Sequence, residues 1–287
     1  LLGSRVLLSS ATLPPALVQG LFEAYRAGRA CFQANRGEPG TPLEIRCAWF
    51  DEFGCTASGH GDAQGFADAH ESFVRRRLEC LAGQEVRRRA RLLPVTTTAG
   101  DRAELCRELA GLLPDWLLQL HRAHHERAPD GRRVSVGLVR LANIEPLIEL
   151  AQALFAQGAP EGMRLHLCVY HSRHPLALRS AIERQLDGLL RRHDPQGLLA
   201  HPLVRGVLAE HPETDQVFVV LASPVAEVGR DHDYDWAVVE PSSMRSLIQL
   251  AGRVRRHRPG ACTEPNLYLL ARNLKGLLGQ AVAFEKP

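Results

Sequence analysis

From residue 132 onward, short apolar runs alternate with amphipathic segments, and this alternation limits the folds that the chain can adopt. The apolar runs are typical of buried strands, and the segments between them have helical spacing. Expected strands cover 134–139, 165–170, 217–221, 236–239 and 267–270, and expected helices cover 145–157, 176–192 and 243–251. Strands and helices in this order build a parallel sheet flanked by helices. We therefore predict an α/β fold here.

The residues before this region follow a different pattern. The apolar run from Arg5 to Leu8 predicts a buried strand that ends at Ser10-Ala11-Thr12. Further elements are expected as a helix over 15–25, a strand over 43–50, a helix that carries Phe66, Phe73 and Leu78, an arginine-rich strand over 86–95 and a helix over 101–126. The three apolar side chains at helical spacing are interpreted as core, with a base-stacking platform as the alternative. The expected parts are the end of a preceding domain over 1–15, an α+β connector or insertion over 16–130, the α/β domain over 131–272 and the start of a linker over 273–287.

The charge of the chain is almost balanced. With a formal net charge of +3, bulk electrostatics cannot hold the protein to nucleic acid. Arginines nevertheless gather at 75–77, 87–91 and 253–258, and guanidinium groups suit phosphate. For the first two clusters, a solvated face is the simpler interpretation.

The cysteines favour a reducing compartment. There are seven, an odd number, and none forms a Cys-x-x-Cys pair, so neither a disulfide framework nor a zinc ribbon is indicated. No apolar run approaches the roughly 20 residues that cross a bilayer. We expect a cytoplasmic protein without a membrane segment.

The run 249–256 carries the most informative motif. It fits Q-x-x-G-R-x-x-R, the sixth motif of superfamily 2 helicases, with Gln249, Arg253 and Arg256 at its fixed positions. Because the arginines are three residues apart, both project to the same side of a helical turn. Such groups stabilise negative charge on a transferring phosphoryl group, and Gln249 is a candidate to position the nucleotide or the attacking water. The alternative is a basic helix end that complements the helix dipole.

A second motif follows the expected strand over 217–221. Ser223, Glu227, Gly229, Asp231 and Asp235 fit the fifth helicase motif, in which a hydroxyl residue precedes E-x-G-x-D. Ser223 is a candidate contact to a nucleic-acid phosphate, and Gly229 lets the backbone approach a nucleotide. Asp231 can accept a hydrogen bond from a ribose hydroxyl or from a finger arginine. A serine replaces the commoner threonine, and Pro224 replaces glutamine, which puts base-side contacts there in doubt.

Two shorter motifs occur at expected strand ends. His171-Ser172-Arg173 resembles the H-S-R loop that contacts the phosphate backbone in the second lobes of helicases. Ser10 and Thr12 match the third motif, whose hydroxyls couple hydrolysis to movement. Each match is short, but the order of third motif, H-S-R loop, fifth motif and sixth motif is hard to obtain by chance.

The runs 10–15, 222–229 and 249–257 resemble the CRISPR-associated helicase-nuclease of type I systems. Their amino-acid sequence is most similar to subtype F (YPEST). The resemblance covers essentially the whole chain. It implies that residues 131–272 form the second RecA-like lobe, of P-loop NTPase type, of a superfamily 2 helicase. It also implies that residues 1–15 end the first lobe and that the chain is cut from a longer protein.

The resemblance further implies an activity, cofactors and partners. The whole protein would be an ATP-dependent DNA helicase that moves 3′ to 5′ and degrades foreign DNA in antiviral defence. ATP with Mg²⁺ would be held mainly by the first lobe, with Gly229, Asp231, Arg253 and Arg256 contributing from this chain. Divalent metals would serve a nuclease domain outside it. The implied partners are single-stranded DNA, an RNA-guided surveillance complex, an adaptation integrase subunit and phage anti-CRISPR inhibitors.

A complete nucleotide site is not expected in this chain. Neither Lys275 nor Lys286, its only lysines, follows the Gly-rich turn of a P-loop, so we expect no ATP hydrolysis by the chain alone. Asp51-Glu52 begins like an acidic box but suits a plain turn.

No metal site is predicted either. His232-Asp233 lacks the other histidines and aspartates of an HD nuclease. His121 and His125 have the i, i+4 spacing of a zinc pair, but Arg122 stands where a glutamate base is needed, and a solvated helix face explains the pair as well.

Two functional hypotheses remain open. The first is half of a motor, in which Arg253 and Arg256 complete an ATP site while His171, Ser172, Arg173 and Ser223 hold single-stranded DNA. The second is a degenerate, non-catalytic lobe that binds nucleic acid or a protein. A Rossmann enzyme is disfavoured, because no G-x-G-x-x-G follows a strand.

Overall fold

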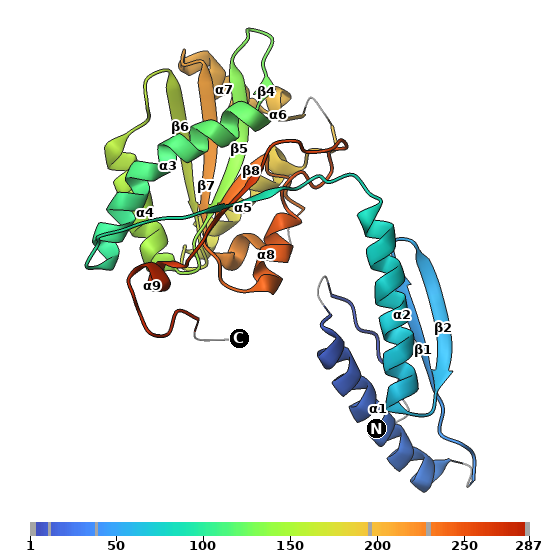
Figure 1. The fold of residues 1–287 in the computed structure, drawn as a ribbon. Helices are drawn as coiled ribbons and strands as arrows, with labels where there is room; N and C mark the ends of the chain where they lie inside the picture. The colour runs from blue at the N-terminus through green and yellow to red at the C-terminus, as the bar shows by residue number, and fades with distance from the viewer. Residues whose placement is uncertain (1–3, 11–12, 38–39, 195–196, 228–230, 285–287) are drawn as a thin grey trace. The chain divides into compact units, whose positions relative to one another are not determined.

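The computed structural model describes residues 4–10, 13–37, 40–194, 197–227 and 231–284 (Figure 1). The chain divides into two compact units, Leu1–Gln84 and Glu85–Pro287. Each unit has its own sheet and its own apolar core. Among the described residues, no helix has the length and apolar character needed to cross a membrane.

The first unit contains two helices and a hairpin: α1 (Pro15–Arg36), β1 (Ile45–Asp51), β2 (Gly54–His60) and α2 (Ala63–Ala82). β1 and β2 pair antiparallel. The carboxylate of Asp51 closes the hairpin, because it accepts hydrogen bonds from the backbone N–H groups of Phe53 at 2.8 Å and Gly54 at 2.9 Å. The plain turn expected here is confirmed.

Aromatic rings form the core of this unit. Phe22 of α1 and Phe66 of α2 stack with centroids 4.1 Å apart, and the ring of Trp49 lies 5.7 Å from that of Phe66. Phe66 therefore belongs to a core, as predicted, and Phe73 packs near Trp49 at 6.4 Å. Leu78 was wrongly assigned to this core. It is 60% exposed, because the buried cluster takes Phe66, near the start of α2, and not the later turns.

The strand predicted over Arg5 to Leu8 does not form. Residues 4–10 have no regular secondary structure, and Val6 and Leu7 are largely exposed. A strand is stable only where a neighbour satisfies its backbone groups, and no described strand pairs with this run. Ser10 is exposed, and Thr12 lies outside the described residues.

The second unit is built on a seven-stranded sheet in the order β3-β9-β8-β5-β7-β6, with β4 paired to β5. The strands are β3 (Ala90–Leu93), β4 (Glu126–Arg127), β5 (Arg133–Arg140), β6 (Met163–Tyr170), β7 (Asp215–Ala222), β8 (Trp236–Val239) and β9 (Leu267–Leu270). The pairing of β4 with β5 is antiparallel, and the other pairings are parallel. The predicted parallel α/β fold is confirmed, and its five predicted strands correspond to β5 to β9.

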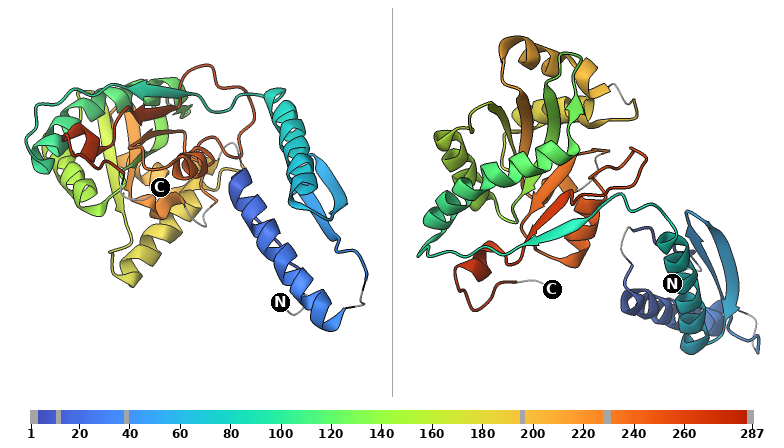
Figure 2. Two further views of the ribbon diagram at one scale, coloured as in Figure 1. Left: turned by 60° about the horizontal axis from the view of Figure 1, so that its bottom comes forward. Right: turned by 45° about the horizontal axis from the view of Figure 1, so that its top comes forward.

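Helices lie on both faces of this sheet (Figures 1 and 2). They are α3 (Arg102–His124), α4 (Ile144–Gln157), α5 (Leu176–Leu190), α6 (Gly197–Ala200), α7 (Pro202–Glu210), α8 (Met244–Ala251) and α9 (Leu274–Leu277). Buried residues of α3 and α4 join one apolar cluster, and buried residues of α5, α7 and α8 join a second. Successive residues of β7 alternate between the two clusters and are all buried, which explains the unbroken apolar run in the sequence.

The second unit begins earlier than the boundary expected at residue 131. β3 pairs with β9, and buried residues of α3 share a cluster with those of α4. The segment 85–130 therefore belongs to the sheet-containing unit, and the expected connector over 16–130 spans parts of both units. The sequence alone did not predict that β3 belongs to this sheet. β3 is an edge strand whose side chains are mostly exposed, so it lacks the apolar run of a central strand.

His121 is a buried member of this unit. Its Nδ1 lies 2.7 Å from Ser135 Oγ, and its Nε2 lies 3.1 Å from Asp215 Oδ1. Trp236 Nε1 donates to the same Ser135 oxygen at 3.0 Å, and Arg133 forms an ion pair with Asp215. The solvated helix face considered for His121 is wrong, and both of its ring nitrogens already have protein partners.

We expect acid to destabilise the second unit through His121. Burial lowers the pKa of His121 from 6.5 to about 4, although Asp215 counteracts part of this. The unfolded chain therefore takes up this proton at a higher pH than the folded protein. As the pH falls from 6.5 towards 4, the free energy of unfolding should decrease by on the order of 2–3 kcal/mol from this group. Urea unfolding across this range measures the decrease. In His121→Asn the dependence on pH should be flatter, and an unchanged slope would rule out His121 as its source.

Candidate nucleotide and nucleic-acid site

The carboxyl ends of three neighbouring strands, β5, β7 and β6, bring the sequence motifs to one end of the sheet. There Ala222 of β7 pairs with Tyr170 of β6 and with Arg140 of β5. The backbone N–H of Ser223 donates to Tyr170 O at 3.2 Å, and that of Leu141 donates to Ala222 O at 3.1 Å. The H-S-R loop therefore lies beside the fifth motif, at the edge where parallel sheets bind their ligands.

The loop His171-Ser172-Arg173 places two exposed polar residues next to a buried histidine. The ring of His171 stacks on that of His174 with centroids 3.8 Å apart. Burial and the neighbouring charges of His174 and Arg173 lower the pKa of His171, which favours a neutral ring at pH 7. Arg173 forms an ion pair with Glu145 that is exposed on both sides. Such pairs contribute little free energy, so a phosphate can replace Glu145 at small cost.

The 3₁₀ turn η1 (Pro224–Glu227) connects Ser223 to a buried ion pair. Glu227 Oε1 accepts hydrogen bonds from Arg140 Nε and from Ser246 Oγ, each at 2.6 Å. Arg140 has no exposed surface, and a buried charge is tolerated only when it is paired and hydrogen-bonded. Through Glu227, Arg140 therefore holds the fifth motif against the start of α8.

Arg253 follows α8 and reaches the same turn. Its Nη2 donates to the backbone oxygen of Glu227 at 3.1 Å. Burial and the nearby charge of Arg256 lower the pKa of Arg253, but a guanidinium group remains charged at neutral pH. Its Nε is buried and makes no hydrogen bond. A charged donor left in this state favours an anionic ligand.

Asp231 of the fifth motif contacts Arg256 of the sixth. Arg256 Nε lies 2.7 Å from Asp231 Oδ1, and both side chains are partly exposed. Burial raises the pKa of Asp231, but the charges of His257 and Arg256 outweigh it and lower the pKa below its ordinary value. Of the two partners predicted for Asp231, a ribose hydroxyl and a finger arginine, the contact with the arginine is present in the folded chain.

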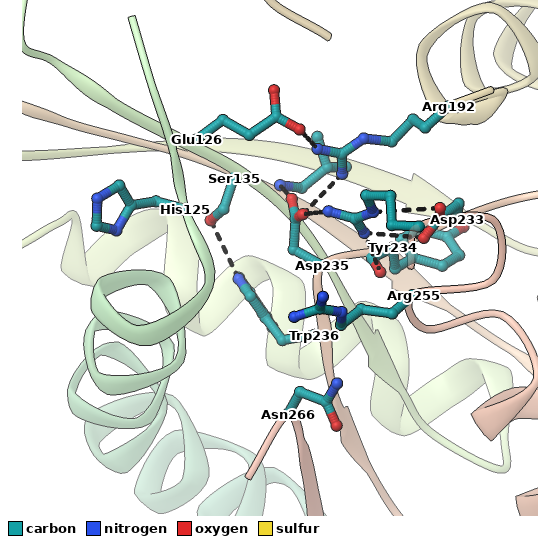
Figure 3. Close-up of polar contacts among 12 residues, drawn as sticks. His125, Glu126, Ser135, Arg192, Asp233, Tyr234, Asp235, Trp236, Arg255 and Asn266 are labelled. Carbon is teal, nitrogen blue, oxygen red and sulfur yellow. Dashed lines mark hydrogen bonds and ion pairs between the residues drawn. The ribbon is translucent and has the colours of Figure 1, made fainter. Parts of the chain in front are cut away.

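Two buried aspartates connect the fifth motif to the sixth (Figure 3). Asp235 accepts a hydrogen bond from Arg192 Nη1 at 2.7 Å and forms an ion pair with Arg258. Asp233 accepts from the backbone N–H of Arg256 at 3.0 Å and from Arg258 Nη2 at 2.8 Å. The segment that carries Arg253 and Arg256 is therefore held by buried charge pairs, and Asp233 serves this connection.

The arginine-rich segment around β3 is also structural. Arg88 Nε donates to the backbone oxygen of Val254 at 2.7 Å, a residue that lies between Arg253 and Arg256 in the sequence. Arg89 Nε donates to Cys262 O at 2.6 Å, and the guanidinium of Arg91 lies over the ring of Tyr268 at 5.7 Å. Arg88 is half-buried by its contact, whereas Arg89 and Arg91 make these contacts and stay exposed, as the solvated face predicts.

Several residues of the site escaped prediction from the sequence. Arg140, Arg192 and Arg258 lie outside the fixed positions of the motifs. Of these three arginines, only Arg140 has a signal in the sequence. It is a charged residue at the end of an apolar run, which indicates a buried ion pair. Of the predicted residues, Gln249 is half-buried on α8, and Gly229 lies outside the described residues.

Comparisons with known proteins agree with these motifs. Residues 133–259 match the family model described as "CRISPR-associated nuclease/helicase Cas3, C-terminal". The whole chain is 63% identical to "CRISPR-associated nuclease/helicase Cas3 subtype I-F/YPEST" of Pseudomonas aeruginosa (strain UCBPP-PA14). It is 47% identical, again over its whole length, to the protein of the same name from Pectobacterium atrosepticum. The chain spans 27% and 26% of the length of these two relatives.

Solved structures share the fold. The structures of T. fusca Cas3 and of T. fusca Cas3-AMPPNP both align with a TM-score of 0.52 and 19% identity. They cover 93% and 91% of this chain, which corresponds to 26% of each of those proteins. At this identity the likeness supports the fold, and the parallel sheet with helices on both faces is a RecA-like lobe. The sequence relatives and the matching model establish that the chain belongs to the CRISPR-associated nuclease/helicase Cas3 family of subtype I-F/YPEST.

Proposed function

We propose that the chain supplies the second RecA-like lobe of an ATP-dependent DNA helicase that moves 3′ to 5′. In this proposal the full-length protein unwinds and degrades foreign DNA in antiviral defence, as the name nuclease/helicase of its relatives suggests. The chain completes an ATP site but does not hydrolyse ATP alone, because its sequence contains no P-loop. A cytoplasmic location is consistent with its seven free cysteines.

One observation carries this proposal, namely the contacts at the two ends of η1. Ser223, immediately before the turn, lies beside the H-S-R loop, where we place single-stranded DNA. Glu227, at the end of the turn, accepts a hydrogen bond from Arg253, where we place the nucleotide. Because η1 has only four residues, we propose that it couples a displacement at one end to the other. This arrangement suits a protein that couples DNA movement to ATP hydrolysis.

The residues beside η1 fit a nucleotide. The buried Nε of Arg253 lacks a partner, and the side chain of Arg256 is 41% exposed, so both guanidinium groups can contact phosphate oxygens. With ATP and Mg²⁺ held mainly by the first lobe, these two groups stabilise the charge that develops on the transferring phosphoryl group. Gln249 is proposed to help position the nucleotide or water, and Asp231 to orient Arg256.

The remaining partners belong to the full-length protein. We propose His171, Ser172, Arg173 and Ser223 as contacts to single-stranded DNA, and Ser10 with Thr12 as the coupling motif. The RNA-guided surveillance complex, the adaptation integrase subunit and anti-CRISPR inhibitors are proposed as protein partners, without assigned residues. Divalent metals are proposed for the nuclease domain.

Arg173→Ala tests the DNA path in the full-length protein. Losing one phosphate contact should reduce the slope of log affinity for single-stranded DNA against log salt concentration by about 0.7. Fluorescence anisotropy at several salt concentrations measures this slope. Arg164→Ala is the matched control, because Arg164 is an exposed arginine at the other end of β6 and should leave the slope unchanged.

The outcomes separate the two functional hypotheses. Equal slopes for Arg173→Ala and the wild type would contradict a DNA contact at the H-S-R loop. DNA-stimulated ATP hydrolysis by the full-length protein is expected. Its absence from a well-folded preparation would favour the non-catalytic binding module.

A further inference from the structure

Three side chains from separate parts of the second unit bring metal-ligand atoms together. His193 follows α5, Asp231 belongs to the fifth motif and His257 follows the sixth. One ligand atom from each residue lies within 4.8 Å of the other two. We infer that these three residues form a binding site for a divalent transition-metal ion, and that Zn²⁺ suits it best.

The distances agree with one shared ion. His193 Nε2 lies 3.3 Å from Asp231 Oδ2, and His257 Nε2 lies 3.0 Å from Asp231 Oδ1. In a tetrahedral zinc site with bonds of about 2.0–2.2 Å, ligand atoms are roughly 3.3–3.5 Å apart. The two imidazole rings have centroids 4.0 Å apart, so small rotations bring both nitrogens to that spacing. A water molecule would complete the four ligands.

Hydrogen bonding accounts for only one of the two histidines, because His193 Nε2 and Asp231 Oδ2 form a hydrogen bond at 3.3 Å, which a bound ion would replace. His257 Nε2 is buried and makes no hydrogen bond, despite its closeness to Asp231 Oδ1. That oxygen is already paired with Arg256 Nε at 2.7 Å. An ion can therefore bind Oδ2 and leave Oδ1 on the guanidinium group, an arrangement in which the ligating carboxylate is itself held by a second partner.

The backbone around the two histidines is already fixed by one buried carboxylate. Arg192 and Arg258, which are the sequence neighbours of His193 and His257, both bind Asp235. The backbone N–H of His257 also donates to Asp233 Oδ2 at 3.1 Å. Ligands on such fixed supports need little reorganisation to hold a metal.

The donor set identifies the kind of ion. Two imidazole nitrogens and one carboxylate oxygen suit Zn²⁺ and its neighbours among the transition metals, whereas Mg²⁺ prefers oxygen ligands. The site is therefore distinct from the Mg²⁺ that accompanies ATP. One consequence rests on the proposed function: a bound ion would hold Asp231 and Arg256 in place and so inhibit ATP hydrolysis.

Zinc titration of the metal-free full-length protein tests the site. Isothermal titration calorimetry with Zn²⁺ alone should show, besides any binding by the nuclease domain, a binding event in the wild type that is weakened by about 100-fold or lost in His193→Ala and in His257→Ala. The variants keep all cysteines and the nuclease domain, so the difference reports on this cluster. His125→Ala is the control and should bind as the wild type does, since it removes a histidine from the other close pair.

Two readouts keep the site separate from the proposed function. Identical zinc binding by the wild type and both variants would overturn the site. In ATP hydrolysis assays, Zn²⁺ should inhibit the wild type and have a smaller effect on His193→Ala. If binding is lost in His193→Ala but inhibition is not, the metal site stands and its link to hydrolysis fails. If the wild type does not hydrolyse ATP, the proposed function fails, while the titration still decides the site.

Discussion

Arg253→Ala in the full-length protein is expected to reduce DNA-stimulated ATP hydrolysis by a factor of about 10³ or more and to abolish unwinding. The physical reason is that Arg253 Nε is a buried charged donor without a partner, next to the turn that connects the proposed DNA and nucleotide regions. Removing it leaves the developing phosphoryl charge without its preorganised counter-charge. Steady-state ATP hydrolysis and strand displacement measure the two effects.

Two further variants make this prediction specific. Arg253→Lys keeps the charge but loses the planar fork of donors, so it should recover only part of the activity. Arg245→Ala removes an exposed arginine from the same helix, α8, and should retain wild-type activity. Circular dichroism spectra that match the wild type establish that each variant is folded. Unwinding at the wild-type rate by Arg253→Ala would refute the assignment.

Asp235→Ala should lower the free energy of unfolding of the second unit by about 3–5 kcal/mol. Asp235 has no exposed surface, and it binds Arg192 and Arg258, which are themselves largely buried. Its removal leaves these guanidinium groups in a low-dielectric interior with fewer counter-charges. Its carboxylate also accepts the backbone N–H of Val136 at 2.7 Å, and this hydrogen bond is lost too. Denaturant unfolding measures the change.

A surface ion pair provides the comparison. Arg164 and Glu213 lie 3.7 Å apart with partly exposed side chains, so Arg164→Ala should cost no more than about 1 kcal/mol. Asp235→Asn keeps the shape and the acceptor oxygen and should fall between the two. Similar losses for Asp235→Ala and Arg164→Ala would mean that the buried network contributes no more than a surface pair.

The sequence predicted the second unit well where strands are buried on both faces. From Val217 to Ala222, β7 is an unbroken apolar run because helices cover both sides of the sheet, and such a run is recognisable without a structure. It also predicted a strand where β3 forms but assigned it to the connector, because β3 is an edge strand whose side chains are mostly exposed. It was wrong at Arg5 to Leu8, an apolar run with which no strand among the described residues pairs. In both cases, neighbours that are remote in sequence decide the outcome.

The sequence by itself determined the parallel α/β fold, the family and the candidate residues at the strand ends, because periodicity and motif spacing are local properties of the chain. Only the tertiary structure decided the partners of the charges. Arg140 pairs with Glu227, Asp235 with Arg192, and His121 with Asp215. The two partners of each pair are more than 40 residues apart in the sequence. Burial makes an unpaired charge costly, so these pairings are selected by packing, which no local pattern records.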